Sequence, residues 1–132
     1  MKKIIIIIES SSNYFDAYAE NCPGVYGAGE TVEETQKNVL EGLRLYIEQH
    51  KDHLPEILAG DYEIEYRYDV QSFLKRYSRQ FSLSGLEVVT GINQKQLSHY
   101  VTGRKRPRKQ TVEKIEKSIR NFAKDLSQVH FV

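Results

Sequence analysis

The sequence predicts an α+β chain of two small domains, a βββαβ domain over residues 1–68 followed by an all-α domain over residues 69–132. Short β-branched or alternating runs are confined to the first half, whereas apolar residues recur at helical spacing in the second. Residues 1–68 hold 6 basic and 13 acidic residues, a net charge of −7, and residues 69–132 hold 13 basic and 5 acidic residues, a net charge of +8. Opposite charges of this size indicate two domains with different partners.

Four β-strands are expected in the first domain. The β-branched run Lys3–Glu9 predicts a buried strand, and Tyr14–Glu20 alternates as a second one. The Pro23–Gly24 pair breaks the chain before a third short strand at Val25–Gly29. The seven residues Tyr62–Tyr68 alternate as a half-buried fourth strand does. One face of that strand is expected to carry Tyr62, Ile64, Tyr66 and Tyr68.

One helix is expected between the third and fourth strands. Thr31 and Glu34 have the spacing of a capping box, so the helix should start at Thr31 and end near His50. Its apolar positions follow the 3.6-residue period and are Val32, Val39, Leu40, Leu43 and Ile47. A domain of about 68 residues has a small core, so partner binding or self-association would stabilise it.

Four helices are expected beyond Asp69. The first has Val70, Phe73, Leu74 and Tyr77 on its apolar face. The second opens on a capping box formed by Ser84 and Glu87 and stops at Gly91. The third is capped by Asn93, ends at Gly103 and buries Leu97, Tyr100 and Val101. The fourth spans Thr111–Leu126, with Val112, Ile115, Ile119, Phe122 and Leu126 at helical spacing.

Two short helices joined by a tight turn at Gly91 are typical of a helix-turn-helix. The third helix would then carry a polar face opposite its apolar one, made of Gln94, Lys95, Ser98, His99 and Thr102. Glutamine pairs with adenine and lysine donates to guanine, so we expect bases to be read by Gln94, Lys95, Ser98 and His99. Phosphate contacts are expected from Thr102 and the cations that follow, Arg104, Lys105, Arg106, Arg108 and Lys109.

The segment Gly91–Gly103, followed by Arg104–Pro107 and a helix with Thr111 and Ile115, resembles the XRE or Cro-like repressor helix-turn-helix. The resemblance covers roughly residues 69–126. It implies that Ser84 and Asn93 lie at helix N-termini near phosphates and that Gln94, Lys95, Ser98 and His99 face bases. The implied partner is operator double-stranded DNA, read by a homodimer or higher oligomer on paired half-sites.

The first half resembles the N-terminal domain of HicB-type antitoxins over Tyr14–Thr35, followed by Leu40–Leu43 and Tyr46. The matching positions are Pro23–Gly24 and Gly29–Glu34. This resemblance implies a partial RNase H-like fold that binds HicA, a small basic mRNA-cleaving toxin with a double-stranded-RNA-binding-like fold. A net charge of −7 complements such a toxin and would speed association with it. The chain is therefore expected to neutralise a HicA-like toxin and to repress its own operon.

We expect no catalytic residue, no metal and no cofactor. A two-metal nuclease needs converging carboxylates, but acids on an alternating strand, here Glu9, Asp16 and Glu20, are most simply explained as surface residues. A metal site at His50 and His53 would lack a third close ligand, and histidines at a helix C-terminus also complement the macrodipole.

The single cysteine, Cys22, has no base beside it and excludes an internal disulfide. The apolar run Ile4–Ile8 is too short for a signal peptide or a membrane span, so we expect a cytoplasmic protein with no membrane partner. An RNA-stacking platform would suit Tyr62, Tyr66 and Tyr68, but the negative local charge favours a core or a protein interface.

The main alternative is a stand-alone transcriptional repressor whose first domain senses a ligand or only dimerises. A small basic HicA-like reading frame beside this gene would favour the antitoxin. No pattern marks the residues that contact the toxin. The sequence gives little reason to expect a short dimer-forming strand in the tail Ser127–Val132.

Overall fold

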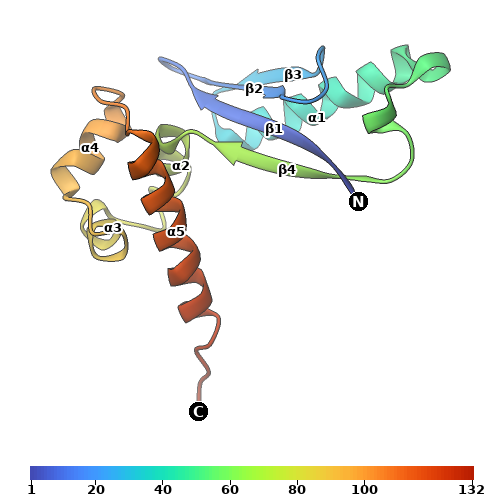
Figure 1. Cartoon of the computed structure of the whole chain (residues 1–132). Coiled ribbons are helices and arrows are strands. Elements are labelled where there is room, and N and C mark those ends of the chain that lie inside the picture. Colours follow the sequence, from blue (N-terminus) through green and yellow to red (C-terminus); the bar gives the residue numbers. More distant parts are fainter. The chain divides into compact units, whose positions relative to one another are not determined.

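The computed structural model describes residues 1–132 and has the expected α+β composition, a four-stranded sheet with five α-helices (Figure 1). The chain divides into two compact units, Met1–Arg76 and Tyr77–Val132. The first unit carries a net charge of −6 and the second a net charge of +7, counted from the sequence. None of the helices has the length and apolar character that crossing a membrane requires.

The sheet has the strand order β3-β2-β1-β4, in which β1 pairs antiparallel with β2, and β2 antiparallel with β3. The strands are β1 (Lys2–Ser10), β2 (Phe15–Ala19), β3 (Tyr26–Gly29) and β4 (Tyr62–Tyr68). The fourth strand lies parallel to β1, and a parallel pair needs a crossover connection. That connection is made by α1 (Val32–Gln49) and the 3₁₀ turns η1 (Lys51–His53) and η2 (Glu56–Leu58). The βββαβ order is as expected.

Helix α1 covers one face of the sheet only (Figure 1). On that face Ile4, Ile6 and Ile8 have no solvent-exposed surface, whereas Ile5 and Ile7 on the other face are half-buried. The first strand, which was expected to be buried, is thus fully buried on one face only, because alternate side chains of a strand point to opposite faces. The rest of the core comes from Phe15, Ala17, Ala19, Cys22, Val25, Val32, Val39, Leu43 and Leu58, with Tyr62, Ile64, Tyr66 and Tyr68 packed against it as expected.

Glycines let β3 lie directly on α1. A Cβ atom added to Gly27 would lie 2.5 Å from the backbone nitrogen of Val39, and one added to Gly42 would lie 2.6 Å from the carbonyl oxygen of Tyr26. Backbone therefore packs against backbone at this contact. As a result, β3 turns the Tyr26 side chain to the uncovered face of the sheet, where 72% of its surface is exposed.

The Thr31 half of the expected capping box is present at the start of α1, where the Thr31 hydroxyl accepts a hydrogen bond from the Glu34 N–H at 3.0 Å. One residue that was expected on the apolar face of α1, Leu40, does not belong to the core. Leu40 is 40% exposed, while Thr35 is fully buried and donates its hydroxyl to the Thr31 carbonyl at 2.7 Å. Leu40 follows the buried Val39 and lies about 100° round the helix from it, which takes its side chain away from the sheet.

Helix α2 (Val70–Arg76) was expected to open the second domain, but it belongs to the first unit. The Asp69 carboxylate accepts hydrogen bonds from the Ser72 N–H at the start of α2 and from the Ser10 N–H at the end of β1, at 2.7 and 3.0 Å. Lys75 donates to the Ser10 hydroxyl at 3.0 Å, and Arg76 pairs with Glu33 at 2.6 Å. These bonds join α2 to the sheet and to α1, so the boundary lies after Arg76 rather than after residue 68.

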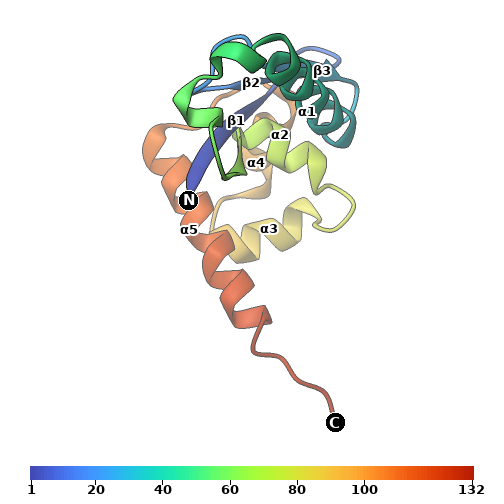
Figure 2. The same ribbon diagram turned by 90° about the vertical axis from the view of Figure 1, so that its right-hand side faces the viewer.

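The second unit contains three α-helices, one fewer than expected: α3 (Leu83–Thr90), α4 (Gln94–Thr102) and α5 (Lys109–Leu126) (Figure 2). Helix α3 contacts both of the others. The buried side chains are Leu86, Thr90, Leu97, Tyr100 and Ile115, and the rings of Phe81 and Phe122 meet edge-on with centroids 6.1 Å apart. Beyond α5 the chain runs away from the helix end (Figures 1 and 2), and Ser127–Val132 forms neither helix nor strand.

Candidate nucleic-acid interface

A tight turn joins α3 to α4. Helix α3 ends as expected at Gly91, whose φ of 74° lies in the left-handed region that glycine adopts without a steric penalty. The preceding Thr90 is buried, donates its hydroxyl to the Leu86 carbonyl at 2.7 Å and accepts the Ile92 N–H at 3.1 Å. These bonds keep the turn short and fix the direction in which α4 leaves it.

Two side-chain oxygens cap the N-terminus of α4. Asn93 is the N-cap, as expected, and its side-chain oxygen accepts the Lys95 N–H at 2.7 Å. The Glu87 carboxylate, which comes from α3, accepts the Gln94 N–H at 2.7 Å. Helix α4 is therefore held to α3 at its first residue as well as through the core.

The expected base-reading residues all lie on the accessible side of α4. Gln94 and Lys95 are exposed, Ser98 and His99 are half-buried, and the expected phosphate contact Thr102 is exposed. Leu97 and Tyr100 are buried on the opposite side, whereas Val101, which we expected to be buried, is half-buried. A helix of nine residues with this polar face has the size and donor groups to enter a major groove.

The environment of His99 lowers its pKa below the usual 6.5. The main cause is partial burial, and the positive charges of Arg104, Lys105 and Lys95 add to it. A neutral imidazole at pH 7 offers one donor and one acceptor to a base edge. Lys95 lies at the start of α4, and Arg104 and Lys105 follow its end, so cations from both ends of the helix act on His99.

The expected capping box at Ser84 was wrong. The N-cap of α3 is Ser82, whose hydroxyl accepts the Gly85 N–H at 3.0 Å. Ser84 lies in the first turn of α3, is exposed, and has its hydroxyl 3.1 Å from that of Ser82. It therefore remains at the start of α3, as the repressor resemblance implied, although it does not cap the helix.

The cationic loop after α4 folds back on the end of that helix. Gly103 has a φ of 78° and ends α4 as expected, and the Lys105 N–H donates to the His99 carbonyl at 3.2 Å. The side chains of Arg104, Lys105, Arg106, Arg108 and Lys109 are all exposed. Lys109 is already the first residue of α5, and Arg108 is the N-cap position of α5 but gives its N–H groups no side-chain cap.

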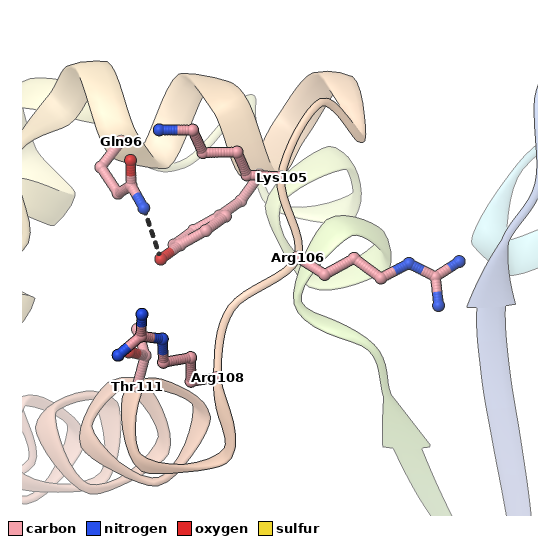
Figure 3. Close-up of a pocket in the computed structure, with 6 residues that line it drawn as sticks. Gln96, Lys105, Arg106, Arg108 and Thr111 are labelled. Atoms are coloured by element: carbon pink, nitrogen blue, oxygen red, sulfur yellow. Dashed lines mark hydrogen bonds between the residues drawn. The ribbon is translucent and has the colours of Figure 1, made fainter.

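A cavity of about 590 Å³ lies between α4, this loop and the start of α5 (Figure 3). It is lined by Gln96, Tyr100, Lys105, Arg106, Arg108 and Thr111. Gln96 donates to the Tyr100 hydroxyl at 3.0 Å. Figure 3 shows Gln96 on the α4 side and Arg108 with Thr111 on the α5 side, while the Arg106 side chain points away from them. Cations and neutral donors around one cavity suit a phosphate group.

Three of the expected phosphate contacts, Lys105, Arg106 and Arg108, thus line one cavity, together with residues that the sequence had not singled out. Tyr100 was expected only as a core residue, and Gln96 and Thr111 only as parts of helix starts. The missed signal was the hydroxyl of Tyr100, since the hydroxyl of a buried tyrosine needs a polar partner or an open edge. Here Gln96, one helical turn earlier, supplies the partner.

The first unit contains the residues that the sequence raised, and set aside, as catalytic or metal-binding candidates. Glu9 and Asp16 lie opposite each other on β1 and β2, and Cys22 is buried, which raises the pKa of its thiol. The His50 ring stacks on Tyr46 with centroids 4.1 Å apart, and its Nδ1 lies 2.8 Å from the Tyr46 carbonyl oxygen. No group of three or more His, Cys, Asp or Glu side chains is placed to hold a metal ion.

Helix α4, its capped N-terminus and the cationic cavity beside it thus form one candidate interface within the second unit. The comparisons with known proteins found no match to a protein-family model, to a curated protein or to a solved structure.

Proposed function

We propose that this chain is a DNA-binding repressor that also neutralises a basic protein toxin, as HicB-type antitoxins do. The observation that carries the DNA-binding half is the accessible polar face of α4, which lies beside a loop of exposed cations in a unit of net charge +7. The polar face would read base edges and the cations would hold phosphates. The double-stranded operator DNA would include the promoter of its own operon.

The test is binding of the full-length chain to duplex DNA from upstream of its gene. Replacing Gln94, Lys95 and His99 together by alanine should abolish preference for that DNA over a scrambled duplex. Lys124→Ala, an exposed cation in the last turn of α5, is the matched control and should bind as the wild type does. Equal loss in the control, or unchanged preference in the triple variant, would remove α4 as the reading helix.

The toxin-binding half is assigned to the first unit. Its net charge of −6 complements a basic RNA-cleaving protein, and the resemblance of Tyr14–Thr35 to HicB-type antitoxins names the class of that partner. The βββαβ order supports the partial RNase H-like fold that the resemblance implies. Neutralisation needs no enzyme chemistry and no cofactor, because covering the RNA-binding surface of the toxin is sufficient.

Co-purification tests this half directly. The full chain should form a tight complex with the product of the adjacent small basic reading frame and should silence its RNA cleavage. The triple α4 variant should silence cleavage equally well, because neutralisation and DNA reading lie in different units. Absence of such a complex would favour the alternative, a stand-alone repressor whose first domain senses a ligand or only dimerises.

We further infer that the chain acts in the cytoplasm as a homodimer or higher oligomer. Self-association is supported by the end of α5 and the tail, where Leu126 is 56% exposed, Val129 52% and Phe131 94%. Sedimentation of the full chain and of a chain ending at Asp125 checks this point. The truncated chain should form a smaller oligomer than the full chain, for example a monomer in place of a dimer. If both chains form the same oligomer, the contact between protomers lies elsewhere.

A further inference from the structure

The face of the sheet that α1 leaves uncovered carries a row of apolar and aromatic side chains. The strand pairing places Tyr26 opposite Tyr18, and Tyr18 opposite Ile7, so the three lie side by side across β3, β2 and β1. Tyr26 is 72% exposed, Tyr18 is 42% exposed and Ile7 is half-buried. Aromatic side chains of this kind are enriched in protein interfaces and depleted elsewhere on surfaces.

Carboxylates flank this row on β1 and β2, while on its β4 side Ile7 lies opposite Arg67. Asp16 and Glu9 form the neighbouring pair across β2 and β1, and Glu20 follows β2, with its N–H bonded to the Ile5 carbonyl at 2.8 Å. The Tyr18 hydroxyl donates to Glu9 at 3.1 Å, and this bond is the main reason why the pKa of Tyr18 is raised. None of the three carboxylates has a lysine or arginine within salt-bridge distance.

Other carboxylates of the first unit are neutralised. On α1, Glu41 and Glu48 pair with Arg44 at 2.7 and 3.1 Å. On β4, Glu65 pairs with Lys3 and Arg67 at 3.3 and 2.7 Å. On the sheet itself, the carboxylates without a salt bridge are Glu9 and Asp16, which lie beside the tyrosines, and Glu20 follows directly after β2.

We propose that this acidic tyrosine face, defined as Ile7, Glu9, Asp16, Tyr18, Glu20 and Tyr26, is the docking surface for a basic protein. The tyrosines would supply the rigid apolar anchors and the unpaired carboxylates would meet lysine or arginine side chains. The charge argues against two other occupants. A nucleic acid would bring phosphates against carboxylates, and a second copy of the same face would bring carboxylates against each other.

The proposal rests on the proposed function in one respect, because the basic protein would be the toxin. It deepens that function by assigning toxin contacts to residues that the sequence did not mark. The helix side of the unit offers matched controls, because α1 covers the opposite face of the sheet. Tyr26→Ala is therefore compared with Leu45→Ala, a residue of α1 that is 44% exposed, and Asp16→Lys with Glu48→Lys.

Two probes are titrated into the full-length chain: an oligo-arginine peptide, and the basic product of the adjacent reading frame. In the peptide titration, NMR resonances of Tyr18 and Tyr26 should shift first.

The variants are compared in binding of the adjacent product. Tyr26→Ala should weaken this binding by at least about tenfold, as loss of an interface anchor does, whereas Leu45→Ala should cause no such loss. Asp16→Lys should slow association more than Glu48→Lys does. Thermal unfolding verifies that each variant is folded, and Asp16→Asn, which removes only the charge, replaces Asp16→Lys if that variant unfolds.

The outcomes separate the inference from the function beneath it. Tight binding of the adjacent product that none of the face variants changes would overturn the inference and leave the antitoxin function standing. Peptide shifts on this face, with no binding of the adjacent product, would support a basic-protein surface while the antitoxin function fails. Peptide shifts confined to α1 would overturn the inference, and so would binding of a single-stranded RNA oligonucleotide through Tyr18 and Tyr26.

Discussion

The carboxylate of Glu87 on α3 accepts a hydrogen bond from the backbone N–H of Gln94, the first residue of α4, at 2.7 Å. The first N–H groups of a helix have no partner within the helix, and a carboxylate there also meets the positive end of the helix dipole. This bond therefore stabilises α4 and, together with the Thr90 bonds of the turn, helps to set its angle to α3. That angle determines how Gln94 and Lys95 would reach a base edge.

Removing this cap should destabilise the second unit and weaken DNA binding. Glu87→Ala is expected to lower the free energy of unfolding by about 1 kcal/mol, the usual cost of a lost N-terminal cap. Glu87→Gln keeps an acceptor oxygen and should lose less. Chemical denaturation and fluorescence anisotropy with duplex DNA measure the two effects. If only the charge of Glu87 mattered, both variants would bind DNA more tightly than the wild type.

The loop cations should set the salt dependence of DNA binding. Replacing Arg104, Lys105 and Arg106 together by alanine is expected to flatten the plot of log K against log salt by about 0.9 per lost phosphate contact. The matched control removes Lys117, Arg120 and Lys124, three exposed cations of α5. Anisotropy at several salt concentrations gives both slopes, and a slope unaltered by the loop variant would exclude these side chains from the phosphate interface.

DNA binding should strengthen as the pH falls, because of His99. Its pKa in the free chain lies below 6.5, so the ring is neutral at pH 7. Nearby DNA phosphates would favour the charged ring and raise this pKa in the complex. Affinity should therefore rise as the pH falls from the pKa of the complex to that of the free chain.

Fluorescence anisotropy measures this dependence between about pH 7.5 and 5.5, an interval that brackets the ordinary pKa of histidine. His99→Ala should lose the pH dependence, whereas His53→Ala, an exposed histidine of the first unit, should retain it. An equal pH dependence in wild type and His99→Ala would place the titrating group elsewhere.

Gly27 should be intolerant of any side chain. A Cβ there would lie 2.5 Å from the Val39 backbone nitrogen, and a helix backbone cannot move aside as a flexible side chain can. Gly27→Ala is expected to destabilise the first unit by about 1–3 kcal/mol, the usual cost of overpacking. Ala28→Ser, at the next, exposed position, is the control. Thermal or chemical denaturation compares them, and equal stabilities would show that β3 can lift from α1 at little cost.

Local patterns predicted most element boundaries well. The strand Tyr62–Tyr68 and the helix ends at Gly91 and Gly103 were located from the sequence, because alternation and glycine at a helix end act over a few residues. The accessible face of α4 followed from the same kind of local argument. The cap of α3 did not, because Ser82 and Ser84 both precede the apolar run and the path of the preceding chain decides between them.

By itself, the sequence determined the α+β class, the βββαβ order, the split of charge and the polar face of α4, since each depends on neighbouring residues. Only the tertiary structure decided that β4 lies parallel to β1, that Asp69 ties α2 to Ser10, and that the Tyr100 hydroxyl opens into a cavity. It also decided which face of the sheet is left uncovered. These features join residues far apart in the chain, and their stability depends on the position of a whole helix or strand, which no short pattern of residues encodes.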